Sequence, residues 1–288
     1  MANFIQNLFN GVTIGMVYFL IAAGMSIVLG IMGITNLAHG AIFMIGAYSG
    51  WTIAVQLNLN YYLALVVGGL AAAVVGSIIE RGFLRVLYKQ PNEQVLVTFG
   101  FVLVLGNAVL WTWGAASHLQ FTAPGLMGAV DIGGVFFAKA RIFILVVGLI
   151  LGLILWWVQD RTRVGAMVRA GMDDKEMIMG LGINLPVVSA LVFFLATFLA
   201  GFAGVMGSSI IGPNPGMGLD MLLLALVVTI VGGIGSIQGA LLGGVVIGVL
   251  DTFGKVLFPQ FGLFTMYLAM VIILLIRPRG LLGRRIGQ

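Results

Sequence analysis

Cysteine is absent from this 288-residue sequence, and charged residues make up only 8% of it. Without cysteine the chain has no disulfide bond, no thiolate metal site and no cysteine nucleophile. The two histidines, His39 and His118, are far apart in the chain, and neither belongs to a metal-ligand spacing. A phosphate-binding loop of the form Gly-x-x-x-x-Gly-Lys-Ser/Thr is also missing. We therefore expect no catalytic residue, no metal and no cofactor in this chain, and we predict that it is not an enzyme.

Hydrophobic residues, in contrast, make up 61% of the sequence, far above their share in soluble domains. A helix needs about 20 mostly apolar residues to cross a bilayer, and apolar runs of roughly this length fill the chain. We predict an all-α polytopic membrane protein, a single transmembrane domain over residues 1–288 with about eight or nine membrane helices, some of them short or discontinuous. The runs cover residues 9–32, 39–55, 61–79, 94–113, 142–158, 187–211, 219–231, 236–250 and 261–276.

Glycine is abundant, with 43 residues. In lipid, small residues spaced four apart allow two helices to approach closely, so such pairs predict helix contacts. The pairs include Gly11 with Gly15, Gly46 with Gly50, Gly148 with Gly152, Gly239 with Gly243, and Gly244 with Gly248.

Positive charge gathers in three segments, residues 80–93, 159–186 and the tail from residue 277, which hold most of the 14 Lys and Arg residues. Because cytoplasmic loops of membrane proteins are enriched in Lys and Arg, we expect these segments and the C-terminus to face the cytoplasm. The loop at residues 114–140 then lies on the outer side. Its pattern predicts a small ordered cap, such as a hairpin.

Two glycine-containing breaks interrupt the apolar runs, at residues 33–38 and 232–235. Residues 219–250 are too few for two full crossings, so at least one of their two helices is short or broken. Paired interrupted segments mark the substrate path of many transporters. Whether the two breaks are related by an internal repeat is left as an open question by the sequence. The candidate passage residues are Thr35, Asn36, His39, Gly232, Gly233, Ser236 and Gln238. For His39 the alternative is packing against a neighbouring helix. For Thr35, Asn36 and Ser236 the alternative is helix capping.

The segment at residues 165–186 combines charged residues with apolar ones and predicts a helix on the membrane surface. Its charged residues include Arg169, Asp173, Asp174 and Glu176, and its expected apolar side consists of Met167, Ala170, Met177, Met179 and Leu181. An ordinary charged loop is the alternative. Glu80, Asp220 and Asp251 fall at the ends of predicted spans, so a proton relay inside a span is not expected. A transport passage that has neither a proton relay nor an ATP-binding site needs energy from another protein. The surface helix is where such a protein could act on this chain.

Four blocks of the sequence carry a family resemblance. They are FNGVTIGMVYFLIAAGMSIVLGIMGITNLAHGAIFMIGAY at residues 9–48, RAGMDDKEMIMGLGIN at 169–184, VGGIGSIQGALLGGVVIGVLD at 231–251 and RPRGLLG at 277–283. With these blocks the chain resembles the permease of bacterial branched-chain amino acid ABC importers, in its shorter type. The resemblance implies a multi-pass protein of the bacterial inner membrane, embedded in lipid and with no nucleic-acid partner. It implies a heterodimer with a second permease subunit, two cytoplasmic ATPases that bind ATP and Mg²⁺, and a periplasmic substrate-binding protein.

The resemblance also implies that residues 165–186 hold the helix that couples the permease to an ATPase. Ala170, Asp174, Gly182 and Ile183 match coupling positions of the family, and we add the neighbouring charged residues Arg169, Asp173 and Glu176. Ile178 departs from the family pattern, which tends to have Ala there. The expected substrate is a branched-chain or related amino acid. Urea, short amides and aromatic acids are alternatives within the family, and a passive channel or facilitator is an alternative outside it.

Overall fold

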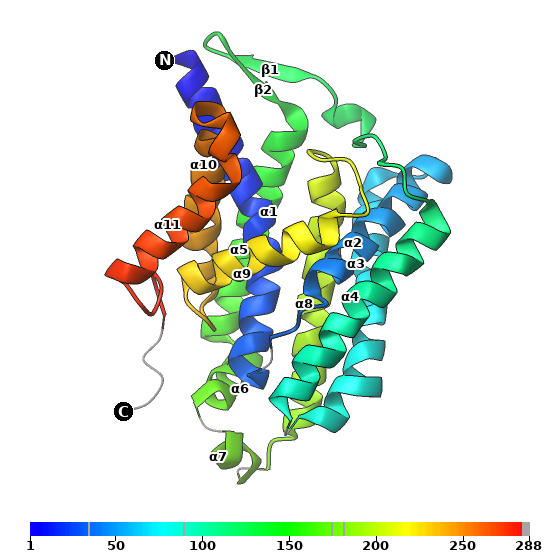
Figure 1. Ribbon diagram of the computed structural model, residues 1–288, viewed down its shortest axis with the longest axis vertical. Helices are drawn as coiled ribbons and strands as arrows, with labels where there is room; N and C mark the ends of the chain where they lie inside the picture. The colour runs from blue at the N-terminus through cyan, green and yellow to red at the C-terminus, as the bar shows by residue number, and fades with distance from the viewer. Residues whose placement is uncertain (34, 89, 174, 181, 284–288) are drawn as a thin grey trace.

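The computed structural model describes residues 1–33, 35–88, 90–173, 175–180 and 182–283, and it is a helical assembly with one small hairpin (Figure 1). The elements, in chain order, are α1 Ala2–Met32, α2 His39–Trp51, α3 Tyr61–Ile79, α4 Pro91–Trp113, β1 Ala129–Ile132, β2 Val135–Ala138, α5 Lys139–Arg161, α6 Arg163–Asp173, α7 Lys175–Gly180, α8 Leu185–Ser208, α9 Met217–Gly232, α10 Ile237–Leu257 and α11 Gly262–Ile276. A π-helical turn at Thr52–Gln56 extends α2, and further short turns at Glu80–Leu84 and Arg85–Leu87 extend α3. Short 3₁₀ turns lie at Pro124–Leu126 and Pro259–Phe261.

Every predicted apolar run corresponds to a helix, which confirms an all-α membrane protein. Within the described residues, six helical segments are long and apolar enough to cross a membrane: Ala2–Met32, Tyr61–Leu87, Pro91–Trp113, Lys139–Arg161, Pro186–Ser208 and Ile237–Leu257. Three helices from the predicted apolar runs are shorter, α2 with 13 residues, α9 with 16 and α11 with 15. At 1.5 Å per residue α9 is about 24 Å long, less than the roughly 30 Å hydrocarbon core. The prediction of short helices beside a break is therefore correct.

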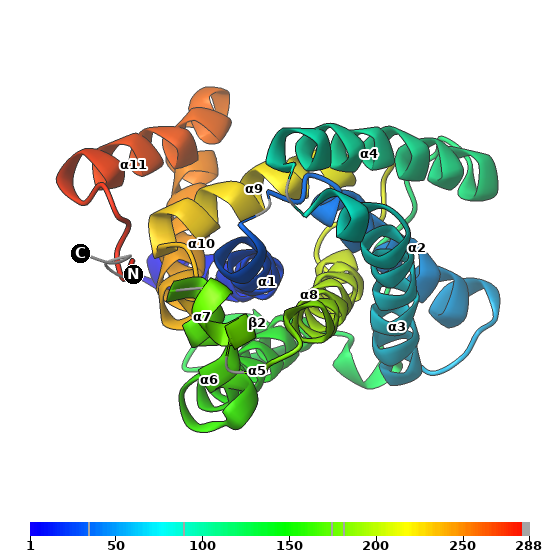
Figure 2. The same cartoon turned by 90° about the horizontal axis from the view of Figure 1, so that it is seen from below.

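Helix α1 is the centre of the molecule, with α5, α8, α9 and α10 around it (Figure 2). Its glycines meet those of α10 at backbone distance. A methyl group on Gly15 would lie 2.9 Å from the Cα of Val245, and one on Gly244 would lie 3.0 Å from the Cα of Phe19. Gly11 and Gly248 belong to the same contact, so the predicted packing of these glycine pairs is confirmed.

The two ends of the molecule differ in structure. The antiparallel β1–β2 hairpin and the N-terminus lie at one end, which we call the hairpin end, and α6 and α7 lie at the other, the α6 end (Figure 1). The hairpin confirms the expected ordered cap in residues 114–140. From the α6 end of α1 the chain turns back into the body, and α2 begins beside Ile21 at His39. Ile21 precedes the last residue of α1 by about 16 Å of helix, so α2 starts well inside the bundle.

Candidate functional site

The described residues of the coupling segment are helical, in α6 and in α7. Thr162 stands before α6, and its hydroxyl oxygen accepts a 3.1 Å hydrogen bond from the backbone N–H of Gly165. Val168 is buried and Met172 is half-buried, so this side of α6 faces the bundle. Arg169 is half-buried.

The apolar side that the sequence predicts for this segment is partly wrong. Among its described residues, Ala170, Met177 and Met179 are exposed and Met167 is half-buried. The side of α6 that faces the bundle contains Gly165, Val168 and Met172, which are three and four residues apart, so Ala170 lies on a different side of this helix. Of the other predicted coupling residues, Gly182 is exposed with a φ of 80°, and Ile183 is half-buried. Asp174 and Leu181 lie outside the described residues, as do the side chains of Asp173 and Glu176.

Met172, near the end of α6, lies between α1 and the break that separates α9 from α10. A methyl group on Gly30 of α1 would lie 3.0 Å from the sulfur of Met172 and 3.1 Å from the Cα of Gly235. A methyl group on Gly235 would also lie 3.0 Å from this sulfur. Because neither glycine has a side chain, the thioether of Met172 touches both backbones. The end of α6 is thus in direct contact with α1 and with the break at residues 232–235, which the sequence assigns to the passage.

The break itself has a defined conformation that α1 and α5 hold. Gly233 and Gly235 have φ angles of 105° and 79°, which strongly favour glycine. The hydroxyl oxygen of Ser26 accepts a 2.9 Å hydrogen bond from the N–H of Gly235. The side-chain amide of buried Gln159 donates to the carbonyl of Gly235 at 2.9 Å and accepts from the N–H of Ile237 at 3.3 Å. The break therefore sits at the end of α5 from which α6 starts, which places it at the α6 end.

The C-terminal tail binds this break, a relationship that sequence reasoning missed. The N–H groups of Leu281 and Leu282 donate to the carbonyls of Val231 and Gly232 at 2.7 and 3.0 Å. These carbonyls belong to the last turn of α9, where the helix itself supplies no partner. Gly280 has a φ of 78° and packs so closely that a methyl group there would lie 2.6 Å from the carbonyl oxygen of Ile230. The glycine that ends the sequence Arg-Pro-Arg-Gly at residues 277–280 was the available signal.

Ser236 and Gln238 lie at the start of α10. The hydroxyl of Ser236 accepts a 2.9 Å hydrogen bond from the N–H of Gly239, so Ser236 caps this helix as the alternative interpretation expects. Gln238 is exposed, and its amide lies 3.5 Å from the carboxylate of Asp160.

The other predicted passage residues form a separate group at the start of α2. His39 is fully buried, and its Nε2 lies 3.0 Å from the carbonyl oxygen of Ile21, as the packing interpretation expects. Asn36 is also buried, and its side-chain oxygen accepts from the N–H of Ala38 at 3.1 Å. Thr35 is half-buried. The seven predicted residues therefore lie in two groups with different neighbours, one deep beside α1 and one at the α6 end.

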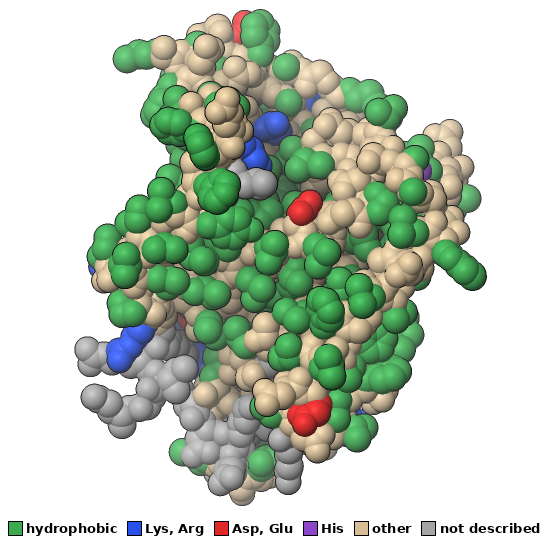
Figure 3. Space-filling view, viewed as in Figure 1, with side chains coloured by type: hydrophobic (Ala, Val, Ile, Leu, Met, Phe, Trp, Pro, Cys, Tyr) green, Lys and Arg blue, Asp and Glu red, His purple; other side chains and the backbone are tan. Residues whose placement is uncertain are grey.

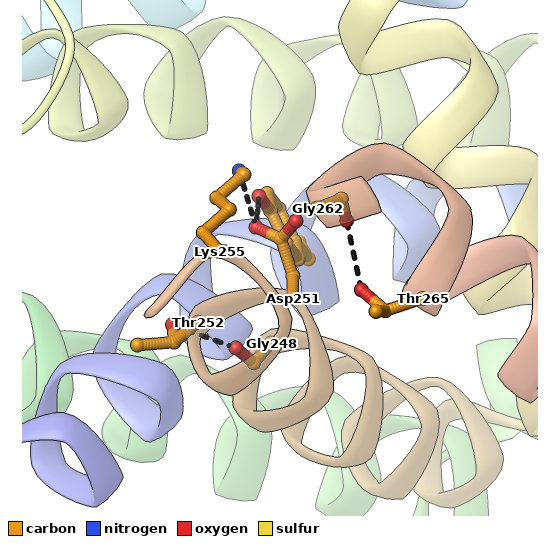
Figure 4. A network of polar contacts seen from close by, with 7 residues as sticks. Gly248, Asp251, Thr252, Lys255, Gly262 and Thr265 are labelled. Atoms are coloured by element: carbon orange, nitrogen blue, oxygen red, sulfur yellow. Dashed lines mark hydrogen bonds and ion pairs between the residues drawn. The ribbon is translucent and has the colours of Figure 1, made fainter. Parts of the chain in front are cut away.

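A buried polar cluster joins α1 and α10 near the hairpin end. Asp251 is only 2% exposed, and its carboxylate accepts from the hydroxyl of Tyr18 at 3.0 Å and from the ammonium of Lys255 at 2.7 Å (Figure 4). The expectation that Asp251 stands at the end of a span is wrong, because α10 continues to Leu257. The charges of Asp251 and Lys255 ended the apolar run, but the two residues are one helical turn apart and neutralise each other.

Comparison with known proteins agrees with this architecture. Residues 7–276 match a family model described as branched-chain amino acid transport system, permease component. The chain is 33% identical to the high-affinity branched-chain amino acid transport system permease protein BraD of Pseudomonas aeruginosa, over 98% of this chain and 96% of BraD. It is 25% identical to the permease protein LivM of Escherichia coli, over 94% of this chain but only 68% of the longer LivM.

Among solved structures, PsaBC from Streptococcus pneumoniae in complex with a Fab has a similar fold, with a TM-score of 0.54 at 13% identity. The match covers 93% of this chain and 89% of that one, and it concerns the fold alone. The relatives are transport permeases and not enzymes. This chain covers 96% of BraD but only 68% of LivM, so its length is that of BraD and not that of the longer LivM. This chain therefore belongs to the permease family of branched-chain amino acid transport systems, and within it to the shorter type.

Proposed function

We propose that residues 1–288 form one permease domain of an ATP-driven importer for branched-chain or related amino acids. In this proposal two cytoplasmic ATPases, which bind ATP and Mg²⁺, dock on α6 and α7 and move them. The observation that carries the proposal is the contact of Met172 with both Gly30 and Gly235. Because this thioether touches two backbones, a displacement of α6 is transmitted to α1 and to the α9–α10 break through a single side chain.

The docking surface in this proposal contains Arg169, Ala170, Asp173, Asp174, Glu176, Gly182 and Ile183. The exposure of Ala170, Met177 and Met179 supports it, because apolar side chains at the end of a membrane protein gain from a partner that covers them. The passage residues have two roles in the proposal. Thr35, Asn36 and His39 fix the start of α2, whereas Gly232, Gly233, Ser236 and Gln238 belong to the part that moves.

The proposed partners include a second permease subunit and a periplasmic substrate-binding protein. The family contains a longer type beside the shorter one, which supports a pair of unlike permeases. Apolar side chains also cover the outer faces of α4, α9 and α11 (Figure 3), and these faces suit lipid or a second permease. The positive-inside tendency places the α6 end and the C-terminus in the cytoplasm of a bacterium, with the hairpin end outside the inner membrane.

The orientation has a direct test, because the natural sequence contains no cysteine. Single cysteines at Leu119, near the hairpin end, and at Ala170, in α6, should differ in labelling by an impermeant thiol reagent added to intact spheroplasts. We expect labelling at position 119 and none at position 170. The reverse pattern would place α6 outside and would remove the basis for an ATPase contact.

Coupling is tested with the complete importer in proteoliposomes. We expect Met172→Ala, and charge reversal at Asp173, Asp174 and Glu176, to lower ATP-driven amino acid uptake severalfold. For Met172→Ala the ATPases should stay bound and active, since only the contact with Gly30 and Gly235 is lost. Normal uptake in both variants would refute the coupling proposal. A passive facilitator is distinguished by solute movement in liposomes that contain this chain without its partners.

A further inference from the structure

A cavity of about 80 Å³ opens between α1, α2, the α8–α9 connection and the first turns of α9. Most of its wall is apolar and comes from side chains that include Ile14, Val17, Phe43, Ile211 and Met221. The upper part of the face in Figure 3 is hollowed between the α10–α11 side and the α8–α9 connection, with hydrophobic side chains inside it and Lys or Arg side chains at its edge. The cavity thus lies in the half of the molecule toward the hairpin end, away from α6.

Three residues bring polar side chains to this wall, and two of them are already engaged. The hydroxyl of Tyr18 donates to Asp251, and the side-chain oxygen of Asn214 accepts from the N–H of Gly216 at 3.1 Å. The third is Asp220, which is exposed in the first turn of α9. Within the described part of the chain its carboxylate has no hydrogen-bond or ion-pair partner. Asp220 is therefore the charged group available to a ligand in this cavity.

An apolar cavity beside a free carboxylate has a specific chemical preference. Its volume is well below the roughly 300 Å³ of the smallest drug-sized pockets, and it suits an aliphatic side chain of a few carbon atoms. Urea or a short amide would leave its hydrogen-bonding groups unpaired against this wall, which is costly. An aromatic acid carries the same charge sign as Asp220 and has no ammonium group to pair with it.

We propose that this cavity binds the side chain of an aliphatic amino acid during transport, with the substrate ammonium paired to Asp220. The inference rests on the proposed function and narrows its substrate class. The carboxylate of the substrate then points away from the cavity, because Asp220 would repel it. The location also agrees with the proposed orientation, since substrate enters from the hairpin end.

The test measures uptake of leucine, phenylalanine, urea and benzoate by the complete importer in proteoliposomes, together with ATP hydrolysis. We expect Asp220→Asn to lower the maximal rate of leucine uptake by about tenfold, and Asp220→Glu to retain most of it. Glu93→Gln is the matched control, because Glu93 is also an exposed acidic residue in the first turn of an apolar helix. It should leave uptake unchanged.

The size of the cavity is tested at Ile211, which is 42% exposed and can be replaced with little effect on folding. Ile211→Trp should fill the cavity and abolish leucine uptake, and Ile211→Ala should raise the ratio of phenylalanine to leucine uptake. Leu119→Trp, an exposed position outside the cavity, is the control for a bulky surface residue. An unchanged ratio in Ile211→Ala overturns the inference even if the other variant assembles poorly.

The outcomes separate this inference from the proposed function. If the wild-type importer shows no ATP-driven uptake of any amino acid, the proposed function fails. If it takes up leucine and the Asp220 and Ile211 variants do so equally well, the cavity inference fails and the function stands. Uptake of urea or benzoate in preference to leucine also overturns the inference, while the role as an ATP-driven permease remains.

Discussion

The side-chain amide of Gln159, close to the end of α5, donates a 2.9 Å hydrogen bond to the carbonyl of Gly235 in the α9–α10 break. The same amide accepts from the N–H of Ile237, so one buried side chain holds both sides of the break. A helix that leads directly into α6 therefore also fixes the backbone that Met172 touches. The arrangement connects the proposed coupling surface to the break by two independent contacts.

Replacing Gln159 by Leu should destabilise the protein, because it leaves two buried backbone groups without partners. We expect a loss of about 2 kcal/mol for each unpaired group, seen as a lower midpoint of thermal unfolding in detergent. Gln6→Leu is the control, since Gln6 also bonds a backbone carbonyl, of Phe136, but at an exposed position. Equal midpoints for the two variants would mean that the Gln159 contacts contribute nothing to stability.

Gly30→Ala should reduce uptake more than it reduces stability. The added methyl group displaces the flexible end of Met172 and meets the Cα of Gly235 behind it, so α6 loses its contact with the break. We expect overpacking to cost about 1 kcal/mol, whereas ATP-driven uptake falls severalfold with ATP hydrolysis maintained. In the control Gly100→Ala the methyl group meets no atom within 4 Å. Unaltered transport in Gly30→Ala would disprove a mechanical role for this contact.

Lys255→Gln should be more harmful alone than together with Asp251→Asn. The single change leaves a buried carboxylate with only Tyr18 as a partner, at a cost of about 2 kcal/mol, below the 3–5 kcal/mol of fully buried pairs because Lys255 is half exposed. The double change removes the buried charge. Thermal unfolding measures both, with Lys139→Gln as an exposed control. Equal stability of the single and double variants would contradict this account.

Gly280→Ala should weaken the attachment of the tail to α9. Both Gly280 and Gly128 have positive φ angles, of 78° and 85°, but only Gly280 lies against other backbone atoms. Gly128→Ala therefore reports the conformational cost alone, about 1–2 kcal/mol. The additional loss in Gly280→Ala measures the close contact, and limited proteolysis should cut the tail faster in this variant. Indistinguishable cleavage of the two variants would show that the tail is held by other means.

Local features of the sequence were enough to predict the helices, because membrane spans depend on the length and hydrophobicity of each run. The break at Gly232–Gly235 and the hairpin could also be predicted, from glycine and from the alternating pattern of residues 114–140. The start of α2 at His39 follows in the same way from the glycine-containing break before it.

Contacts between distant segments could not be predicted, and the arrangement of residues around the α9–α10 break depends on such contacts. Nothing in the local pattern pairs Leu281 with Val231 or Gln159 with Gly235, since these contacts need the folded bundle. Asp251 was misplaced for a related reason. A charge inside a span is costly in isolation, and only the turn of helix that brings Lys255 beside it makes α10 continue.

Docking of residues 281 and 282 on the end of α9 also has a consequence for biogenesis. The carbonyls of Val231 and Gly232 accept hydrogen bonds from N–H groups that are synthesised about fifty residues later, after α10 and α11. The α9–α10 break is thus completed only after α10 and α11 have been synthesised, so a translation product that stops before residue 281 would insert its helices yet lack the partners of these two carbonyls.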